Sequence, residues 1–553
     1  MTMKSFSSHK RKAAAVLAAT LISTSFAAHG QERADMEQLR ATTLNLIEAL
    51  VDSGVLSRQK ADKLVRDAEA KARAQVAAAP APELGKDGKK VVRVPYVPES
   101  VKQEIREQIK QEVLAQSKTE RWGEPGALPE WLDRFQFEGD MRMRYESTTL
   151  DKTNTAPGLA YTDGLYTRSA DMLGSALTGG KPSFNTQNDR TRWRLRARLG
   201  VNAKVSDMIT AGLRISTGNT TERTSTNQTL GQNFNKYSLV LDRAFLKLDP
   251  LPWLSVSGGR IANPYFGTDL VWADDLNFEG IAVTAKPKLS PTVSAFVTAG
   301  WFPLRESNPG RTTSRDLLGV QGGIDWKMTP KTQLKLGAAL YDYRNIEGQA
   351  ETANRFFTAS DYVTRYEYAD GFRQRGNTLF IINALADPNV NWGLASKFRE
   401  LNITGSLDLG QFDPMHVILT GDYVKNLAFD RKEMAARTGF NILDGKDTGY
   451  LAKVQVGDVK TDARGKWNVS LAYRYLGSDA VLDAFTNSDF GLGGTNNKGF
   501  ILGLNYGIDK NSWISARWLS SDLIEPMVPR TAITNPTTKF STDLLQIDLN
   551  ARF

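Results

Sequence analysis

A strict alternation of side chains between Arg192 and Val205 constrains this chain more than any other feature. The odd positions are all apolar, starting with Trp193, whereas the even positions carry four arginines, a glycine, an asparagine and a lysine. Because successive side chains of a strand point to opposite faces, the stretch predicts a β-strand with one apolar and one cationic face. A strand that separates lipid from a water-filled lumen needs both faces.

The same period of two begins at Phe135 and continues to Phe553. Predicted strands lie at about 135–145, 191–205, 209–217, 238–248, 253–260, 277–286, 292–302, 317–328, 332–343, 396–409, 415–427, 449–459, 466–476, 499–508, 512–520 and 544–553. Residues 130–553 are therefore predicted to form an all-β transmembrane β-barrel of about 16 antiparallel strands.

The predicted connections alternate strictly between short and long. Short turns fall at 206–208, 249–252, 287–291, 329–331, 411–414, 461–465 and 509–511. Long loops fall at 146–190, 218–237, 261–276, 303–316, 344–395, 428–448, 477–498 and 521–543. Short periplasmic turns and long outer loops are typical of outer-membrane barrels, so the pattern also predicts the orientation of the chain.

Tryptophans mark both predicted ends of the strands. Trp193, Trp301 and Trp518 lie at the long-loop end, and Trp326 and Trp467 lie at the short-turn end, each on the apolar face of its own strand. This placement is typical of the aromatic girdles at the two membrane interfaces. The alternative is a chance placement of common strand residues.

The chain begins with features of a secretory signal peptide, assigned to residues 1–30. Four cations precede an apolar segment at 13–22, and Ala28-His29-Gly30 supplies small residues at the cleavage position, with a cut after Ala27 as the alternative. Removing these four cations lowers the formal net charge from +9 to +5, which weakens the case for a nucleic-acid partner. The segment predicts export to the bacterial outer membrane.

Residue types that are scarce here exclude several chemistries. The chain has no cysteine, so disulfides and thiolate chemistry are excluded. Two of its three histidines leave with the signal, so a catalytic triad would depend on His416 at a short-turn end. No cofactor and no metal site are predicted, and an outer-membrane enzyme is a weaker alternative to a channel.

The segment between the signal and the barrel reads as helical and periplasmic. Residues 31–73 form a predicted helical segment with heptad spacing, 74–98 a linker rich in Ala, Pro, Gly and Lys, and 99–120 an amphipathic helix. The helices either form a trimeric coiled coil below the barrel or a loosely ordered periplasmic stub.

Strand phase places a cluster of arginines on the lumen face. Its members are Arg142, Arg144, Arg192, Arg194, Arg196, Arg198 and Arg214, extended by Arg243 and Arg260. Rings of arginine in a pore favour anions, so the cluster predicts a pore lining with a preference for anions. The alternative is that the arginines pair with lumenal acids such as Glu138 and Asp140 and only brace the wall.

Several motifs together resemble the putative porin family of Gram-negative bacterial outer membranes. They are Val94-Pro95-Tyr96-Val97-Pro98-Glu99 with the helix after it, Leu128-Pro129-Glu130-Trp131, the strand Gly139-Asp140-Met141-Arg142-Met143-Arg144-Tyr145, and the alternating terminal strand that ends on Phe553. The resemblance covers nearly the whole mature chain and implies an outer-membrane channel. It also implies that Phe553 is the signal read by the barrel-assembly machinery, and that the protein is a homotrimer.

Two outer loops carry further candidate residues. By resemblance to general porins, loop 261–276 is expected to fold inward as a constriction and to set Asp269, Asp274 and Asp275 against the basic wall; the alternative is a surface loop with solvated acids. Loop 344–395 combines aromatic residues with Arg365, Arg373 and Arg375. Its aromatic side chains either form a sugar or anion platform or pack the loop onto itself.

The leading functional hypothesis is a porin, a passive diffusion channel for small hydrophilic solutes with a preference for anions. The alternatives are a substrate-specific nutrient channel for an anion or a sugar, and an envelope tether or adhesin. The expected partners are outer-membrane lipid, small hydrophilic solutes and the assembly machinery, and no nucleic acid is expected.

Overall fold

The structure is a computed structural model that describes residues 134–155, 172–173, 183–307, 313–350, 366–369, 372–382, 391–439, 446–526 and 539–553. The chain divides into two compact units, residues 1–120 and 121–553, and the described residues all belong to the second. The predicted signal peptide (1–30), helical segment (31–73), linker (74–98) and amphipathic helix (99–120) lie outside the described residues.

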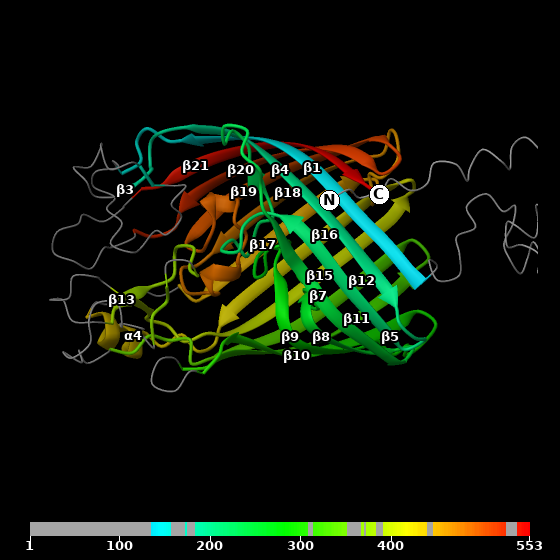
Figure 1. The fold of residues 1–553 in the computed structure, drawn as a ribbon, viewed down its shortest axis with the longest axis horizontal. Coiled ribbons are helices and arrows are strands. Elements are labelled where there is room, and N and C mark those ends of the chain that lie inside the picture. The colour runs from blue at the N-terminus through cyan, green and yellow to red at the C-terminus, as the bar shows by residue number, and fades with distance from the viewer. Residues whose placement is uncertain are drawn as a thin grey trace, which may run out of the picture. The chain divides into compact units, whose positions relative to one another are not determined.

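Sixteen long antiparallel strands form one closed barrel in which each strand pairs with its neighbour along the chain (Figure 1). They are β1 (Phe135–Leu150), β4 (Arg190–Lys204), β5 (Ile209–Thr217), β7 (Leu239–Leu251), β8 (Leu254–Ala262), β9 (Asn277–Ala285), β10 (Val293–Arg305), β11 (Arg315–Thr329), β12 (Thr332–Arg344), β15 (Arg399–Phe412), β16 (Met415–Asn426), β17 (Thr448–Gly457), β18 (Trp467–Leu476), β19 (Asn497–Asp509), β20 (Ser512–Leu523) and β21 (Ser541–Arg552). Pairing of β21 with β1 closes the sheet, which leaves no exposed edge. The predicted barrel and its strand number are confirmed.

Short elements decorate the loops. They are β2 (Met172–Leu173), β3 (Ser183–Phe184), β6 (Gln228–Thr229), β13 (Leu379–Ile381), β14 (Trp392–Leu394), α4 (Arg431–Thr438) and the 3₁₀ helices η4 (Asp483–Phe485) and η5 (Phe490–Leu492). Figure 1 shows β13 and α4 beyond one end of the barrel, on the side of the long loops. Four of these loops are used below: L2 (218–238), L3 (263–276), L5 (345–398) and L7 (477–496).

The two faces of the wall differ as the alternation predicts. On β1, Phe137, Met141 and Met143 are exposed on the outside, whereas Arg144 and Glu146 are buried on the inside. The outer face also carries the five girdle tryptophans, all of which remain 37–49% exposed. An apolar outer surface on every strand suits a wall that faces lipid. Among the described residues, no helix is long and apolar enough to cross a membrane.

Strand β7 departs from strict alternation. Regular phase would place Leu241 and Arg243 on one face, yet Leu241 is exposed outside while Arg243 is directed inward. A β-bulge resolves the conflict: Arg214 of β5 pairs with Arg243 and Ile215 pairs with Leu241, so Asp242 is an extra residue. Asp242 and Arg243 therefore both lie on the lumen side.

At the end of the terminal strand, Phe553 pairs with a glycine of the first strand, Gly139. Backbone hydrogen bonds join Gly139 and Phe553 in both directions, at 2.9 and 3.0 Å. The ring of Phe553 lies directly over Gly139, where a Cβ would come within 2.3 Å of it. The first strand of the barrel thus accommodates the last side chain of the protein.

Candidate functional site

Strands β1 and β4 bring six arginines together in what we call the arginine ladder. It consists of Arg142, Arg144, Arg192, Arg194, Arg196 and Arg198. Arg142 lies opposite Arg196, and Arg144 lies opposite Arg194. Like charges on directly opposed residues are unfavourable, so this wall needs compensating anions. The clustering predicted from strand phase is therefore present in the structure.

Three carboxylates of the barrel wall supply part of the compensation. Asp140 accepts hydrogen bonds from Arg196 and Arg198, at 3.0 and 2.7 Å. Asp548 of β21 accepts two parallel bonds from Arg144, at 2.7 and 2.8 Å. Glu146 pairs with Arg192 and Arg194. Five of the six arginines of the ladder thus pair with a wall carboxylate, but three wall acids face six arginines.

Loop L3 crosses the interior of the barrel rather than lying on its surface. The backbone N–H of Phe266 donates to Gln321 of β11 at 2.7 Å, and the hydroxyl of Thr268 donates to Asp422 of β16 at 2.6 Å. At its far end, Asp275 reaches β4. Contacts with strands this far apart in the sheet require the loop to span the lumen.

Two loop acids meet the arginine ladder directly. Asp275 of L3 lies 3.5 Å from Arg196 Nη1 and 3.1 Å from Arg198 Nη1. Asp489 of L7 lies 3.2 Å from Arg144 Nη1 and 3.0 Å from Arg517 Nη2 of β20. Burial alone would raise the pKa of Asp489, but the guanidinium groups of Arg144 and Arg517 outweigh it and hold that pKa well below its ordinary value. Both loops are therefore tied to the basic wall by ionised carboxylates.

The other two acids predicted for L3 lie elsewhere. Asp269 accepts a 2.5 Å hydrogen bond from Asn487 of L7. Burial, together with the nearby carboxylate of Asp269, raises the pKa of Asp274 to about 6. Of the three predicted acids, only Asp275 faces the ladder, while Asp269 joins L3 to L7.

Arg142 is the least compensated member of the ladder. Its nearest carboxylate among the described residues is that of Asp548, at 4.0 Å, and its Nη2 donates to Asn227 of L2 at 2.5 Å. Its buried Nε has no hydrogen-bond partner in the described part of the chain. A cation held between Arg144 and Arg196 without its own acid leaves local positive charge on the lumen wall.

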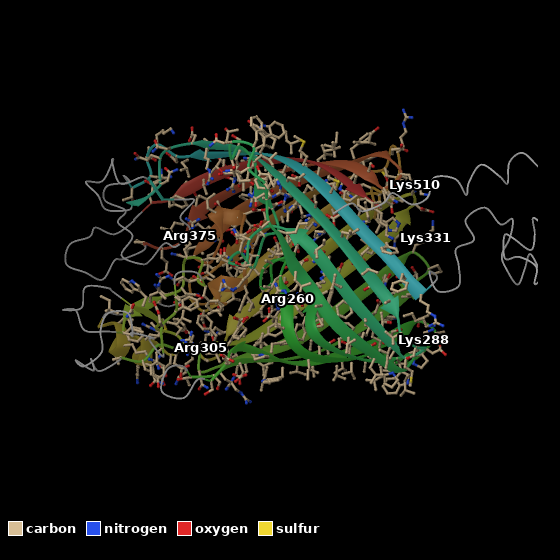
Figure 2. All side chains as sticks on the ribbon, in the orientation of Figure 1. Arg260, Lys288, Arg305, Lys331, Arg375 and Lys510 are labelled. Atoms are coloured by element: carbon tan, nitrogen blue, oxygen red, sulfur yellow. The ribbon has the colours of Figure 1, made fainter. Side chains whose placement is uncertain are left out.

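The remaining predicted arginines form a second group around the β7 bulge. Arg214 donates to Asp242 at 2.6 Å, and Arg243 donates to Asn277 at 2.7 Å. Arg260, midway along the barrel in Figure 2, donates to the backbone oxygen of Asp242 at 2.8 Å and pairs with Glu279. The extra residue of the bulge thus supplies a carboxylate and a carbonyl to two arginines.

The opposite part of the outer lumen holds a packed apolar body, which we call the aromatic plug. Its main side chains are Tyr265 and Trp272 of L3, Phe278, Phe302, Tyr341 and Tyr343 of the wall, Tyr368 and Phe372 of L5, and Phe485 of L7. Trp272 packs edge-on against Phe278 and Tyr341, with centroids 4.9 and 5.0 Å apart. Tyr265 lies against Gly319, whose missing Cβ would come within 2.2 Å of its hydroxyl. The lumen is therefore asymmetric, with a charged side and an apolar side.

Loop L5 packs onto the other loops as well as onto itself. Tyr368 donates to Asp483 of L7, and Phe372 packs edge-on against Phe485 at 5.5 Å. Arg375 lies over the ring of Phe540, with its guanidinium 4.8 Å from the centroid. The described aromatic residues of L5 thus belong mainly to a loop core. Arg365, named in the same prediction, lies outside the described residues.

Sequence reasoning missed the wall acids that matter most. Glu146 was assigned to a loop because β1 continues to Leu150 rather than ending near residue 145. Asp548 was in lumen phase on the terminal strand and could have been found from that phase. Asp242 is hidden by the bulge, and Asp489 lies in a loop that carries no periodic signal.

His416 is the single histidine among the described residues. Its Nδ1 lies 2.6 Å from Asp408 Oδ1 at the short-turn end. In the described residues, no group of His, Asp and Glu side chains is arranged to hold a metal ion.

A closed wall of this kind separates lipid from solutes in water, and the fold together with the charged lumen defines an outer-membrane channel of the porin class. More particularly, the chain belongs to a family described as putative porins, whose sequence model matches residues 40–553. The resemblance inferred from the motifs is therefore confirmed. No curated protein sequence matches the chain.

Solved porin structures are similar at low sequence identity. OprB of Pseudomonas putida is 11% identical with a TM-score of 0.40, over 77% of this chain and 96% of that one. OmpF of Salmonella typhi is 10% identical with a TM-score of 0.39, over 76% and 97%. An anion-selective porin from Comamonas acidovorans is 9% identical with a TM-score of 0.37, over 76% and 99%.

Proposed function

We propose that this protein is a diffusion channel that passes small hydrophilic solutes and prefers anions. The observation that carries the proposal is the charge balance of the arginine ladder. Six guanidinium groups line one side of the lumen, and Arg142 has no carboxylate within hydrogen-bond distance among the described residues. Fixed positive charge in a narrow, water-filled passage attracts anions and repels cations.

The aromatic plug supports the same path for the solute. Because L3, L5 and L7 fill the apolar side of the outer lumen, permeating solutes would pass along the charged side. Asp275 and Asp489 lie in direct contact with arginines of the ladder and anchor L3 and L7 beside this charged side.

The test is the reversal potential of single channels in planar bilayers under a tenfold KCl gradient. We expect a sign that corresponds to anion selectivity at pH 7 and a magnitude that falls in Arg142→Gln. Lys331→Gln is the matched control, because Lys331 lies on a short turn at the far end of the barrel (Figure 2). Cation selectivity in the wild type would refute the anion preference, and absence of conductance steps would refute the channel.

The proposal also covers the oligomeric state, export and membrane insertion of the protein. We infer a homotrimer in the outer membrane, exported by the predicted signal peptide and inserted by the assembly machinery through Phe553. The exposed terminal ring of Phe553 supports the last step, because a recognition signal has to be accessible. Light scattering of the detergent-solubilised protein measures the oligomeric state, and a monomer would contradict the trimer.

A further inference from the structure

A cavity of about 540 Å³ lies in the outer half of the barrel, beside the arginine ladder but distinct from it. We call it the vestibule pocket. It is bounded by L2 and L3, by β5 and β7 to β11, and by single side chains from L5 and L7. Ligand pockets for small molecules commonly have volumes on the order of 300–1,000 Å³, so the space is adequate for a small organic solute.

The floor of the vestibule pocket is apolar and rigid. Phe302 and Leu317 of the wall are each 1% exposed, and Trp272 of L3 is 3% exposed. These side chains are part of the aromatic plug and pack against further rings. Close packing holds these side chains in place, and the partly buried ring of Phe372 of L5 adjoins them at the pocket, so little conformational entropy is lost when a ligand binds there.

The mouth of the vestibule pocket carries charges of both signs in equal number. Arg260 and Glu279 form a cross-strand ion pair between β8 and β9, and L2 contributes Glu222 and Arg223. Arg223 lies with its guanidinium 4.7 Å from the ring centroid of Phe372 and interacts electrostatically with both members of that ion pair. Two cations beside two anions exert no net pull on an ion, in contrast to the ladder.

The acids deeper in the pocket are already neutralised. Asp242 is paired with Arg214, and Asp275 is paired with Arg196 and Arg198. One wall group, in contrast, has unused hydrogen-bonding capacity: the hydroxyl of Ser216 is fully buried, lines the pocket and has no partner in the described part of the chain. A buried hydroxyl without a partner is unfavourable, and a polar group of a ligand would satisfy it.

We propose that the vestibule pocket binds an uncharged, polyhydroxylated solute with one apolar face, that is, a small sugar. Each sugar hydroxyl both donates and accepts, and an ion pair such as Arg260–Glu279 offers a donor and an acceptor side by side. The C–H face of the sugar ring would lie on the aromatic floor. This inference rests on the proposed channel function, since it makes the pocket a capture site on the way into the lumen.

The experiment measures block of single-channel current by maltotriose in KCl at pH 7, with the full-length protein in planar bilayers. We expect concentration-dependent block in the wild type. The double variant R260Q/E279Q keeps the net charge but replaces the charged donor and acceptor with neutral amides, which hydrogen-bond to hydroxyls more weakly, and we expect its half-blocking concentration to rise at least tenfold. S216A removes one hydroxyl with little change in packing; we expect a rise of about threefold, and this variant carries the test if the double variant does not fold.

The matched control is R305Q/E306Q, which makes the same charge-neutral change at the loop end of β10, outside the residues that line the pocket (Figure 2). Its block by maltotriose should equal that of the wild type. Glycylglycine and succinate serve as zwitterionic and anionic probes.

Three results would overturn the inference: no block of the wild type by maltotriose, block by glycylglycine or succinate at lower concentration than by the sugar, or unchanged block in both pocket variants. If the wild type does not conduct, the proposed channel function fails. Calorimetric titration of the solubilised protein with maltotriose then decides the sugar site separately.

Discussion

At the scale of single residues, the arginines of the ladder have two different roles, which can be told apart by whether a carboxylate lies within hydrogen-bond distance. Arg144 holds Asp548 through two parallel bonds and also contacts Asp489, whereas Arg142 has no carboxylate within hydrogen-bond distance among the described residues. A charge without a dedicated acid acts on passing ions, while a charge in a buried pair mainly fixes structure. The two neighbours should therefore respond differently to the same substitution.

Arg142→Gln should change selectivity and leave stability nearly unchanged. A unit charge at about 4 Å contributes about 1 kcal/mol in water, so the anion-to-cation permeability ratio should fall roughly two- to fivefold. The measurement is the reversal potential in a salt gradient. An unchanged ratio would show that Arg142 lies off the path of the ions.

Arg144→Gln should instead weaken the barrel. It leaves the carboxylate of Asp548 without its main partner and that of Asp489 with Arg517 alone, and breaking a buried pair from one side costs about 3–5 kcal/mol. We expect a lower temperature for the loss of the compact form on unheated gels. Arg144→Gln combined with Asp548→Asn should recover part of the loss, and no recovery would argue against the pair as the cause.

Gly139 and Phe553 should behave as a coupled pair. Ala at position 139 places a Cβ within 2.3 Å of the terminal ring and should displace it, which slows closure of β1 against β21. The measurement is the yield of folded barrel after refolding into detergent. In G139A/F553A the clash is absent, so adding G139A to F553A should cause no further loss; a further loss would place the defect in the glycine itself.

At the scale of elements, the loops rather than the strands determine the shape of the lumen. L3 is anchored at both ends of its path, by Thr268 on Asp422 and by Asp275 on the ladder. Asp275→Asn removes one anchor while keeping the shape of the side chain. We expect larger conductance fluctuations in single-channel traces, and Asp522→Asn on β20, away from L3, should leave the traces unchanged.

The loops should also respond to pH. Burial raises the pKa of Asp274 on L3 and of Asp483 on L7, each to about 6 from the ordinary value of 3.8. A carboxyl whose pKa is raised by the fold stabilises the packed loop when protonated, so this stabilisation is full below about pH 3.8 and is lost as the pH rises through 6. The loops should therefore be held most firmly in acid.

Current noise from the open channel checks this pH dependence. We expect more noise at pH 7 than at pH 4.5 in the wild type and a weaker dependence in D274N/D483N. Equal noise at both pH values in the wild type would contradict the assignment.

The strands could be predicted because each one shows alternating side chains over a short stretch of sequence. The loops could not be predicted, because their residues follow no such period. Alternation from Trp193 onward shows that one face of this strand is turned toward lipid. Because every strand crosses the same membrane, the same pattern recurs in all of them. Arg144 lies 345 residues from Asp489 along the chain, and Asn487 lies 218 residues from Asp269, and no period connects either pair. Strand phase thus found the cations of the ladder and Asp140 beside them, while Asp489 emerged only from tertiary structure.

At the scale of the whole molecule, the barrel accounts for the channel without the segment that precedes it. The contacts of residues 121–553 form one compact unit, and β1 closes directly on β21. Deleting residues 31–120 while keeping the signal should therefore preserve single-channel conductance. Loss of envelope attachment with normal conductance would support the tether as an additional role, whereas loss of conductance in correctly inserted protein would show that the segment belongs to the pore.

The bulge in β7 has a consequence for how such a wall tolerates length changes. Adding or removing one residue in a regular strand exchanges its inner and outer faces from that point on. Deleting Asp242 would instead leave the inner and outer faces as they are, because Leu241, Arg243 and Ala244 would then follow one unbroken alternation. One residue could therefore be inserted or deleted at this position during evolution without exchanging the faces of the strand. Such a change would add or remove the carboxylate that accepts a hydrogen bond from Arg214. Related channels that differ by one residue here would differ in lumen charge but not in fold.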